Sequence, residues 1–502
     1  MYTGVSTAPL PFKQWIWKNR IYLFVYFIIV LVQFTWFKWL FPYPSFFPDS
    51  NSYVEAAYYN QAINMWPIGY SRFLQLFAFI AHYDTALILL QYLLLHVSII
   101  YFLSTVIYVL RPGKWLTGIL LLFGVANPIL LHMANFVSSD ALYTALSIIW
   151  ITQLCWILYK PNNWLLFTHA IILVAVFTVR YNAVFYPLIS FIVILTADTS
   201  VKRKMLSVAF SSILLAAFVF HTLHVYKIQT GYNQFSAFGG WQLSANALLP
   251  YSYVDSVKAG EVPQKFRQLH GFVNEHNKAL ATSPYRNDRV LGIYFLWDGN
   301  SPLRRYFAAH GGNKTKTPND FFRRWAKQAP LYGEYGAYLT KEYPMAYTQY
   351  YLWPNLIRYY VPPGEFLDVY NMDRDFVEDM EKKWFNYPTE KIFTRTKDKK
   401  ISYMFVYPYF LAAVNLFYVL GLIGFLTLGG WKASTRYYRS LLVLVLAIWS
   451  CNLGFSVLAS PIVLRYQVFP MLLSFTFGIL LIAYVIRQAF YPQQSEKPAL
   501  YQ

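Results

Sequence analysis

The sequence predicts an all-α polytopic membrane protein. Of its 502 residues, 57% are hydrophobic and 13% are charged, whereas soluble domains carry about 25% charged residues. Several apolar runs reach the roughly 20 residues that a helix needs to cross a bilayer. Basic residues that flank these runs, where they meet anionic headgroups, explain most of the net charge of +19. We therefore expect the lipid bilayer as a partner and no nucleic acid.

About ten spans are expected, and the basic residues of the short connections set their direction. Lys18 and Arg20 precede the first span, which predicts a cytoplasmic N-terminus, and the basic run 202–204 marks another cytoplasmic connection. By alternation the C-terminus is also cytoplasmic, in a plasma membrane or a bacterial inner membrane. The expected spans are residues 21–40, 86–110, 115–131, 141–159, 164–179, 183–195, 205–225, 403–428, 441–458 and 463–486.

The chain divides into three parts by composition. Residues 1–225 hold seven spans, with an outer loop at 41–70 and a break at Asn127-Pro128 near the end of the third span. Residues 226–400 are polar, contain most of the acidic residues and are numerous enough for a domain. We expect this part to be mainly helical, for example over 266–280 and 321–343, and to lie outside the cytoplasm. Residues 401–502 hold three spans and a cytoplasmic tail.

Asp49 is the candidate on which the functional interpretation depends. Asp49 and Glu55 are the only acids among the first 80 residues, and both follow the first span. An acid or serine before residues 54–57 is typical of a helix N-cap, here of a short helix over 53–65 on the membrane surface. Alternatively, Asp49 is a carboxylate held at the bilayer surface to accept a proton, because a charge placed close to hydrocarbon is costly and usually functional.

Two further outer connections carry charged residues. Asp140 follows two serines at the start of the fourth span, where it either caps that helix or contributes to a site. Arg180 lies between the fifth and sixth spans and, among the short connections, is the one basic residue that departs from the alternation. It either extends along the apolar surface to the interface or has a function.

The final and seventh spans also present polar residues to the outer face. Arg465 and Tyr466 lie about a turn into the last apolar run, and an arginine there requires an anion, either a protein acid or a ligand phosphate. His221 and His224 lie three residues apart, on one face of the seventh span. A histidine pair without a third ligand is a weak indication of metal, so no cofactor is expected.

Together these positions bring two carboxylates and two arginines to one face of a helix bundle. A carboxylate base and a guanidinium on phosphate are the groups that displacement of a phosphate leaving group needs. The base activates an acceptor hydroxyl, and the arginine neutralises the leaving phosphate.

Four short motifs resemble those of the GT-C glycosyltransferases, integral membrane enzymes that use polyprenyl-phosphate sugars and include the protein O-mannosyltransferases and the lipid A aminoarabinose transferase. The motifs are Pro48-Asp49-Ser50 with Tyr53, Ser139-Asp140-Ala141-Leu142, Arg180-Tyr181-Asn182 and Arg465-Tyr466. Seven spans before a large outer domain also resemble the family's seven-helix module. The resemblance covers the first seven spans and the last one, but not residues 226–400. The first outer loop has no Asp-x-Asp motif.

The resemblance implies a glycosyltransferase that moves a sugar from a polyprenyl-phosphate-linked donor to an extracytoplasmic lipid, glycan or protein acceptor. From these motifs and from the other polar residues near the outer face we expect three groups of site residues: catalytic Asp49 and Asp140; donor-phosphate-binding Arg180, Arg465 and Tyr466; and substrate-contacting Tyr53, Glu55, Tyr181, Asn182, His221 and His224.

Two alternatives stay open. One is a transporter or flippase of lipid-linked or polar cargo, which needs charged residues deep in several spans and often has inverted repeats. The sequence shows charges at one face and no repeat. The other is a subunit that keeps the GT-C-like scaffold without catalysis.

Overall fold

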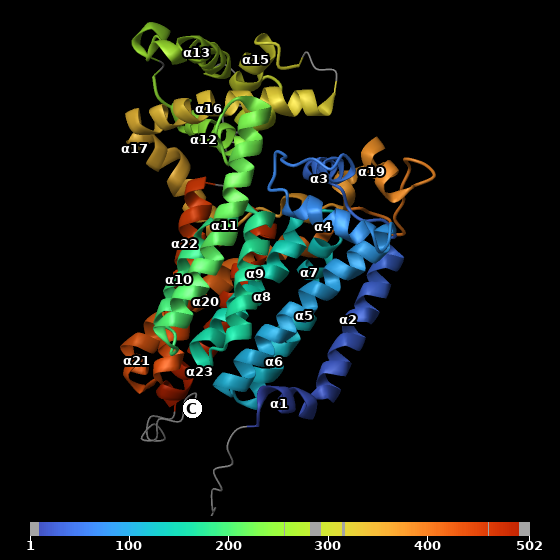
Figure 1. Cartoon of the computed structure of the whole chain (residues 1–502), viewed down its shortest axis with the longest axis vertical. Coiled ribbons are helices and arrows are strands. Elements are labelled where there is room, and N and C mark those ends of the chain that lie inside the picture. Colours follow the sequence, from blue (N-terminus) through green and yellow to red (C-terminus); the bar gives the residue numbers. More distant parts are fainter. Residues whose placement is uncertain (1–9, 256, 282–292, 314–316, 460, 491–502) are drawn as a thin grey trace, which may run out of the picture.

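The computed structural model describes residues 10–255, 257–281, 293–313, 317–459 and 461–490. These residues form helices joined by short connections; they contain no β-strand, only three isolated β-bridges. The helices form two layers: a long bundle and, above it in Figure 1, a smaller group. This upper group includes α12 (Ala237–Tyr251), α13 (Arg267–Ala281), α15 (Pro302–Ala309) and α16 (Pro318–Glu342). One long helix, α11 (Val201–Thr230), runs from the bundle into this upper group.

Among the described residues, eight segments are long and apolar enough to cross a membrane, which confirms a polytopic helical membrane protein. They are Arg20–Leu40 (α2), Asp84–Leu110 (α5), Lys114–Ala134 (α6 and α7), Ser139–Tyr159 (α8), Val201–Thr230 (α11), Ser402–Thr427 (η8 and α20), Arg436–Ala459 (α22) and Leu464–Phe490 (η9 and α23). Two shorter apolar helices, α9 (Asn163–Val179) and α10 (Tyr186–Thr196), correspond to the expected fifth and sixth spans. The total of ten spans therefore stays a prediction.

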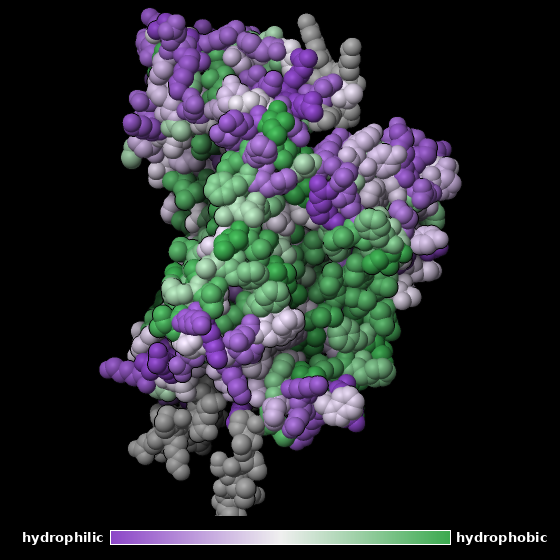
Figure 2. All heavy atoms as spheres, viewed as in Figure 1, coloured by the Kyte–Doolittle hydropathy of each residue, from purple (hydrophilic) through white to green (hydrophobic). Residues whose placement is uncertain are grey.

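The outer surface of the bundle is apolar. Large side chains on α2, α11 and α20 point away from the protein: Val32, Phe220 and Phe417 are 62%, 69% and 54% exposed. Figure 2 shows this apolar surface as a green band between polar ends. Soluble monomers rarely expose contiguous apolar patches of more than a few hundred Å², so the band is the surface that lipid chains cover.

α8 lies in the centre of the bundle and packs against α5, α9, α22 and α23. Its Trp150 is fully buried and donates a 2.8 Å hydrogen bond from Nε1 to Oγ of Ser190 on α10. The Trp150 ring also stacks on Tyr186, with centroids 3.9 Å apart. Because a buried indole N–H needs an acceptor, this bond fixes how α8 and α10 pack.

The expected break in the third span is present. α6 (Lys114–Val125) ends before Asn127, and α7 (Pro128–Ala134) begins with Pro128 as its first residue. Proline has no N–H to donate and clashes with the preceding turn, so it starts a helix but does not continue one. Tyr407 at the start of α20 (Tyr407–Thr427) donates a 2.7 Å hydrogen bond to Oδ1 of Asn127.

The first outer loop forms two short helices, α3 (Pro48–Tyr58) and α4 (Gly69–Ala78). The prediction of one helix over 53–65 was therefore wrong at both ends. Pro48 starts the helix earlier, and the chain leaves it before Asn60, which has φ +48°. α4 begins at Gly69, where a Cβ atom would lie 2.6 Å from the carbonyl oxygen of Thr178 on α9. Only glycine allows this close approach.

The upper group has its own hydrophobic core between α12 (Ala237–Tyr251) and α16 (Pro318–Glu342). Trp241 stacks on Trp325, with centroids 5.2 Å apart. The two helices meet through Gly240, whose Cβ atom would lie 2.0 Å from the carbonyl oxygen of Ala329. The helices expected over 266–280 and 321–343 are confirmed as α13 (Arg267–Ala281) and α16.

Residues 226–400 are divided between two cores. After α18 (Trp353–Tyr360) the chain lies along the end of the bundle that carries α3, where Leu367 and Phe385 join the bundle's main hydrophobic cluster. Phe385 ends α19 (Asp379–Phe385), which packs against α3 (Figure 1). The later part of the expected outer domain therefore covers the first outer loop.

One end of the bundle carries the connections α5–α6, α10–α11 and α20–α22 (Figure 1). The other end carries α3, α4 and the upper group. This is the arrangement that alternating basic connections require. Which end faces the cytoplasm stays a prediction.

Candidate active site

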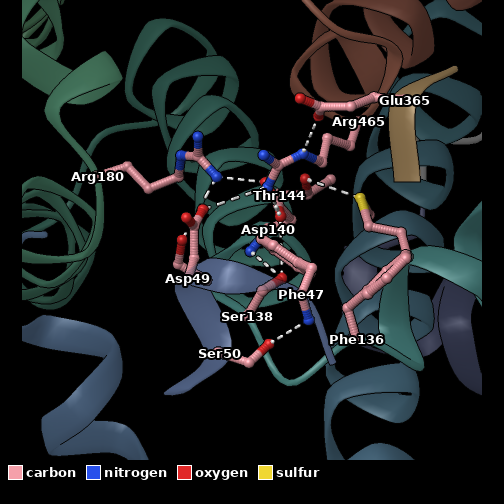
Figure 3. Close-up of polar contacts among 12 residues, drawn as sticks. Phe47, Asp49, Ser50, Phe136, Ser138, Asp140, Thr144, Arg180, Glu365 and Arg465 are labelled. Carbon is pink, nitrogen blue, oxygen red and sulfur yellow. Dashed lines mark hydrogen bonds and ion pairs between the residues drawn. The ribbon is translucent and has the colours of Figure 1, made fainter. Parts of the chain in front are cut away.

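Arg465 lies in the middle of a buried charged cluster next to α3 (Figure 3). It belongs to η9 (Leu464–Gln467), a short 3-10 helix before α23 (Val468–Phe490), and its side chain is 6% exposed. Its Nη1 lies 3.0 Å from Oδ2 of Asp140 and 3.8 Å from Oδ2 of Asp49. Its Nε donates to Oε2 of Glu365 at 3.1 Å. Because a buried guanidinium needs anionic partners, these three carboxylates account for an arginine at this depth.

Asp140 is the most deeply buried acid of the cluster, with its side chain 2% exposed. It lies in the first turn of α8 and forms ion pairs with both Arg180 and Arg465. Ser138, the N-cap of α8, donates from Oγ to Oδ2 of Asp140 at 2.9 Å. The interpretation of Asp140 as a cap was therefore wrong, because Ser138 takes the cap position and leaves the Asp140 carboxylate free to join two guanidiniums.

Asp49 is also not a helix cap. Phe47 is the N-cap of α3 and Pro48 its first residue, so Asp49 is the second residue of the helix. Ser50, one residue further on, accepts a hydrogen bond from the N–H of Phe47 at 3.1 Å. The Asp49 side chain is instead directed toward Arg465 and stays 20% exposed. It is therefore a carboxylate that both the cluster and an incoming molecule can reach.

Burial raises the pKa of the Asp49 carboxyl from 3.8 to about 6. Arg465 acts in the opposite direction and lowers this pKa, while the charges of Asp140 and Glu365 raise it further. Removing a carboxylate from water disfavours its charged form. The pKa of Asp49 thus lies close to neutral pH, which suits a group that takes up and releases a proton.

The cluster contains two guanidiniums and three carboxylates. With every group ionised it carries one excess negative charge, which protonation of Asp49 removes. Among the described residues Arg180 forms one ion pair, with Asp140, whereas Arg465 forms three. Arg180 is therefore the arginine with more donors left for an incoming anion.

Aromatic rings surround both guanidiniums. The centroid of the Tyr466 ring lies 4.2 Å from Cζ of Arg180 and 4.5 Å from Cζ of Arg465. Cζ of Arg465 also lies 4.6 Å from the centroid of the Phe47 ring. Cations are attracted to aromatic faces, more strongly where water is excluded. These rings hold the guanidiniums in place without using their hydrogen-bond donors.

Tyr53 attaches α3 to α8. Its Oη lies 2.9 Å from Oγ of Ser139, which also accepts a 3.4 Å hydrogen bond from Nη1 of Arg180. The Tyr53 carbonyl accepts a 2.9 Å hydrogen bond from Ser71 on α4. Tyr53 therefore helps to position Asp49 against the cluster.

The remaining candidates lie outside the cluster. Glu55 accepts a 3.4 Å hydrogen bond from Gln61, and Tyr181 packs edge-on against Phe235. Asn182 is buried in η1 (Tyr181–Phe185), next to Tyr181 in the sequence. His221 and His224 are exposed on α11, and the described residues place no ion pair or hydrogen bond between them and the cluster.

Glu365 is the site residue that sequence reasoning missed. It follows Pro362-Pro363-Gly364 in a connection with no periodic pattern, and its φ of +52° is left-handed. The carbonyl of Pro363 accepts a 2.9 Å hydrogen bond from the N–H of Leu464. This bond holds the connection against the start of the last span, which brings Glu365 to Arg465. The left-handed φ was the only local sign of an unusual position, and it is visible only in the structure.

No group of three or more histidine, cysteine or acidic side chains is placed to hold a metal ion in the part of the chain that the structure describes.

Comparisons with protein-family models, with curated proteins and with solved structures return no match to this chain.

Proposed function

We propose that the protein is a glycosyltransferase that moves a sugar from a polyprenyl-phosphate-linked donor to an acceptor outside the cytoplasm. One observation carries the proposal: Asp49, Asp140, Arg180 and Arg465, from four separate parts of the chain, meet at one end of the bundle. A carboxylate with a pKa of about 6 next to two arginines has the groups that hydroxyl activation and phosphate departure need.

In the proposed reaction Asp49 takes the proton of an acceptor hydroxyl. The hydroxyl oxygen forms a bond to the anomeric carbon of the donor sugar, and the bond from that carbon to the phosphate oxygen breaks. The electron pair of this bond leaves with the polyprenyl phosphate, whose growing negative charge needs a cation. Arg180 is the better placed of the two arginines, because it forms fewer ion pairs within the cluster.

Asp140 and Arg465 have a positioning role in this proposal. Asp140 holds Arg180 and Arg465 side by side, and Arg465 holds the carboxylates of Asp140 and Glu365. Without these pairs the three acids would repel one another, and Asp49 would have no fixed direction. Prearranged charges of this kind stabilise a transition state because they need no reorganisation during the reaction.

Transport of a lipid-linked cargo is the rival function. A transport pathway needs polar groups through the thickness of the membrane, whereas the five charged groups of this cluster lie together at one end of the bundle. This distribution favours the enzyme.

The test is release of polyprenyl phosphate by the purified full-length protein from a panel of polyprenyl-phosphate sugars, with candidate acceptors present. We expect release with at least one donor, and an Asp49→Asn variant about 10²–10⁴-fold slower, the usual contribution of a general base. Glu55→Gln is the matched control, because Glu55 lies on the same helix and contacts Gln61 rather than the cluster.

Equal rates for wild type and Asp49→Asn would remove Asp49 from the mechanism. Lack of release with every donor, together with movement of an intact lipid-linked sugar across vesicles, would establish the transporter instead.

A further inference from the structure

A cavity lies at the end of the bundle opposite to the charged cluster. It has a volume of about 550 Å³ and is formed between α8, α10 and the first half of α22. Binding pockets for small molecules and cofactors usually measure roughly 300–1,000 Å³. The cavity is therefore large enough for part of a lipid.

One part of its wall is apolar and continues into the lipid-facing surface. Ile189, Val193 and Leu444 line the interior, while Ile192 and Val443 line it and are also 53% and 54% exposed. These exposed side chains lie on the band that the membrane covers. An acyl chain can thus enter from the bilayer without crossing water.

The other part of its wall is basic. Arg436 and Arg439 lie in the first turn of α22, which contains no acidic residue. Nε of Arg439 is buried and has no hydrogen-bond partner among the described residues. The N–H groups at a helix N-terminus add a partial positive charge. Two arginines at this position repel this partial charge and each other, and a bound anion would compensate their positive charges.

The aromatic ring that contacts Arg439 does not use its hydrogen-bond donors. The ring of Trp431, on α21 (Gly430–Ala433), lies 5.9 Å from Cζ of Arg439 and also lines the cavity. A ring at this distance attracts the guanidinium through its face and accepts no conventional hydrogen bond from it. Neither Arg436 nor Arg439 forms an ion pair with a carboxylate in the described part of the chain. The charge on this wall therefore has no carboxylate counterion among the residues that the structure describes.

We propose that this cavity binds one anionic phospholipid of the surrounding leaflet. Its phosphate lies between Arg436, Arg439 and the N-terminus of α22, and one of its acyl chains lies along α10 and α22. A free phosphate would use only the basic wall, and a neutral lipid only the apolar one. Basic pockets between membrane helices are a recurrent way of binding lipid headgroups. This inference does not depend on the glycosyltransferase reaction.

Native mass spectrometry of the full-length protein in detergent, with equal amounts of phosphatidylglycerol and phosphatidylcholine, tests the proposal. We expect wild type to retain one phosphatidylglycerol in preference to phosphatidylcholine. The double variant Arg436→Gln/Arg439→Gln should bind it at least about 10-fold more weakly, since each arginine supplies charge-assisted hydrogen bonds. Lys202→Gln/Arg203→Gln is the matched control: it removes two exposed positive charges from the start of α11, at the same end of the bundle.

A second variant tests the apolar wall. Ala447→Phe places a ring in the cavity and should reduce phosphatidylglycerol binding while all basic residues remain. The melting temperature of each variant shows that it is folded. Unchanged binding in either the double-arginine variant or Ala447→Phe would overturn the proposal. Three other outcomes would also overturn it. One is an equal loss of phosphatidylglycerol binding in the Lys202→Gln/Arg203→Gln control. The others are equal retention of both lipids by wild type, and displacement of phosphatidylglycerol by an equimolar polyprenyl monophosphate.

Discussion

Arg465 donates from Nε to the carboxylate of Glu365 over 3.1 Å, and this bond joins two segments that are 100 residues apart. It attaches the connection after α18 to the start of the last span. It also occupies one edge of the guanidinium, while Asp140 and Asp49 face the Nη1 side. A phosphate that needed Arg465 would therefore have to displace a carboxylate, whereas a phosphate on Arg180 would not.

The pH dependence of turnover follows from Asp49. A base acts only when it is deprotonated, and the pKa of Asp49 is raised to about 6. We expect kcat/KM to fall about tenfold per pH unit below this value and to be level above it. A rate profile of the wild-type protein between pH 4.5 and 8.5 checks this. A profile that is flat across pH 6 contradicts the role of Asp49 as the base.

The same carboxyl affects stability with the opposite sign. Because the pKa of Asp49 is higher in the folded protein than its ordinary value of 3.8, the folded state binds more protons than the unfolded state between about pH 4 and 6. The free energy of unfolding therefore decreases as pH rises through this window. Asp49→Asn should raise the melting temperature at pH 7.5 and have little effect near pH 4, as differential scanning fluorimetry in detergent would show.

Asp140 should matter more for stability than Asp49. Its carboxylate is buried between two guanidiniums, and removing one partner of a buried ion pair costs about 3–5 kcal/mol. Asp140→Asn keeps the shape and removes the charge, so a large drop in melting temperature is expected. Asp198→Asn, at an exposed position on the other end of the bundle, should leave the melting temperature unchanged. A stable Asp140→Asn variant would mean that solvent or lipid compensates the arginines.

Lysine substitutions distinguish the two arginines. Arg180→Lys should weaken binding of the polyprenyl-phosphate donor by about 10–100-fold, since lysine cannot make the bidentate contact with phosphate. Arg465→Lys should mainly lower the melting temperature, because it loses the Nε bond to Glu365. Arg72→Lys on α4 is the control, as Arg72 bonds to Gln61 and Gln75 outside the cluster. Equal donor affinity in Arg180→Lys and wild type would assign Arg180 a structural role.

The orientation of the chain is tested by labelling. Cysteines placed at the exposed positions Lys258 and Lys432 should react from opposite sides of the membrane, Lys258 from outside and Lys432 from the cytoplasm. Reaction of the cysteine at position 258 from the cytoplasmic side alone would reverse the predicted topology and place the cluster at the wrong surface for an extracytoplasmic acceptor.

Eight of the ten expected spans were predictable from the sequence, because hydropathy over about 20 residues reports a requirement of the bilayer and not a tertiary contact. The break at Asn127-Pro128 was predictable for a similar reason, since proline acts on its own turn. The sequence also identified four charged residues of the cluster, because each lies where an apolar run begins or ends, on what the alternation predicts to be the same side of the membrane. They are Asp49, Asp140, Arg180 and Arg465. Their meeting in the structure follows from that placement.

Other features depend on contacts that have no local signal. Glu365 reaches Arg465 only because the chain after α18 turns back over the bundle. His221 and His224 were placed on one helical face correctly by their spacing, but periodicity does not say what packs against that face. α11 continues to Thr230, and both histidines remain exposed along it. The division of residues 226–400 between two cores was not predicted for the same reason. Composition shows that a segment is polar, but it does not show which apolar residues the segment covers.

The distance along the chain between Asp140 and Arg465, 325 residues, has a consequence for biosynthesis. A ribosome adds about 5–20 residues per second, so Arg465 is made roughly 15–65 s after Asp140. During that interval the outer end of α8 has only Arg180 as a counter-charge, and Asp49 has no arginine from the last span. The final ion pairs form when that span is inserted, and a chain released before this point would carry an uncompensated acidic patch that quality-control proteases can recognise.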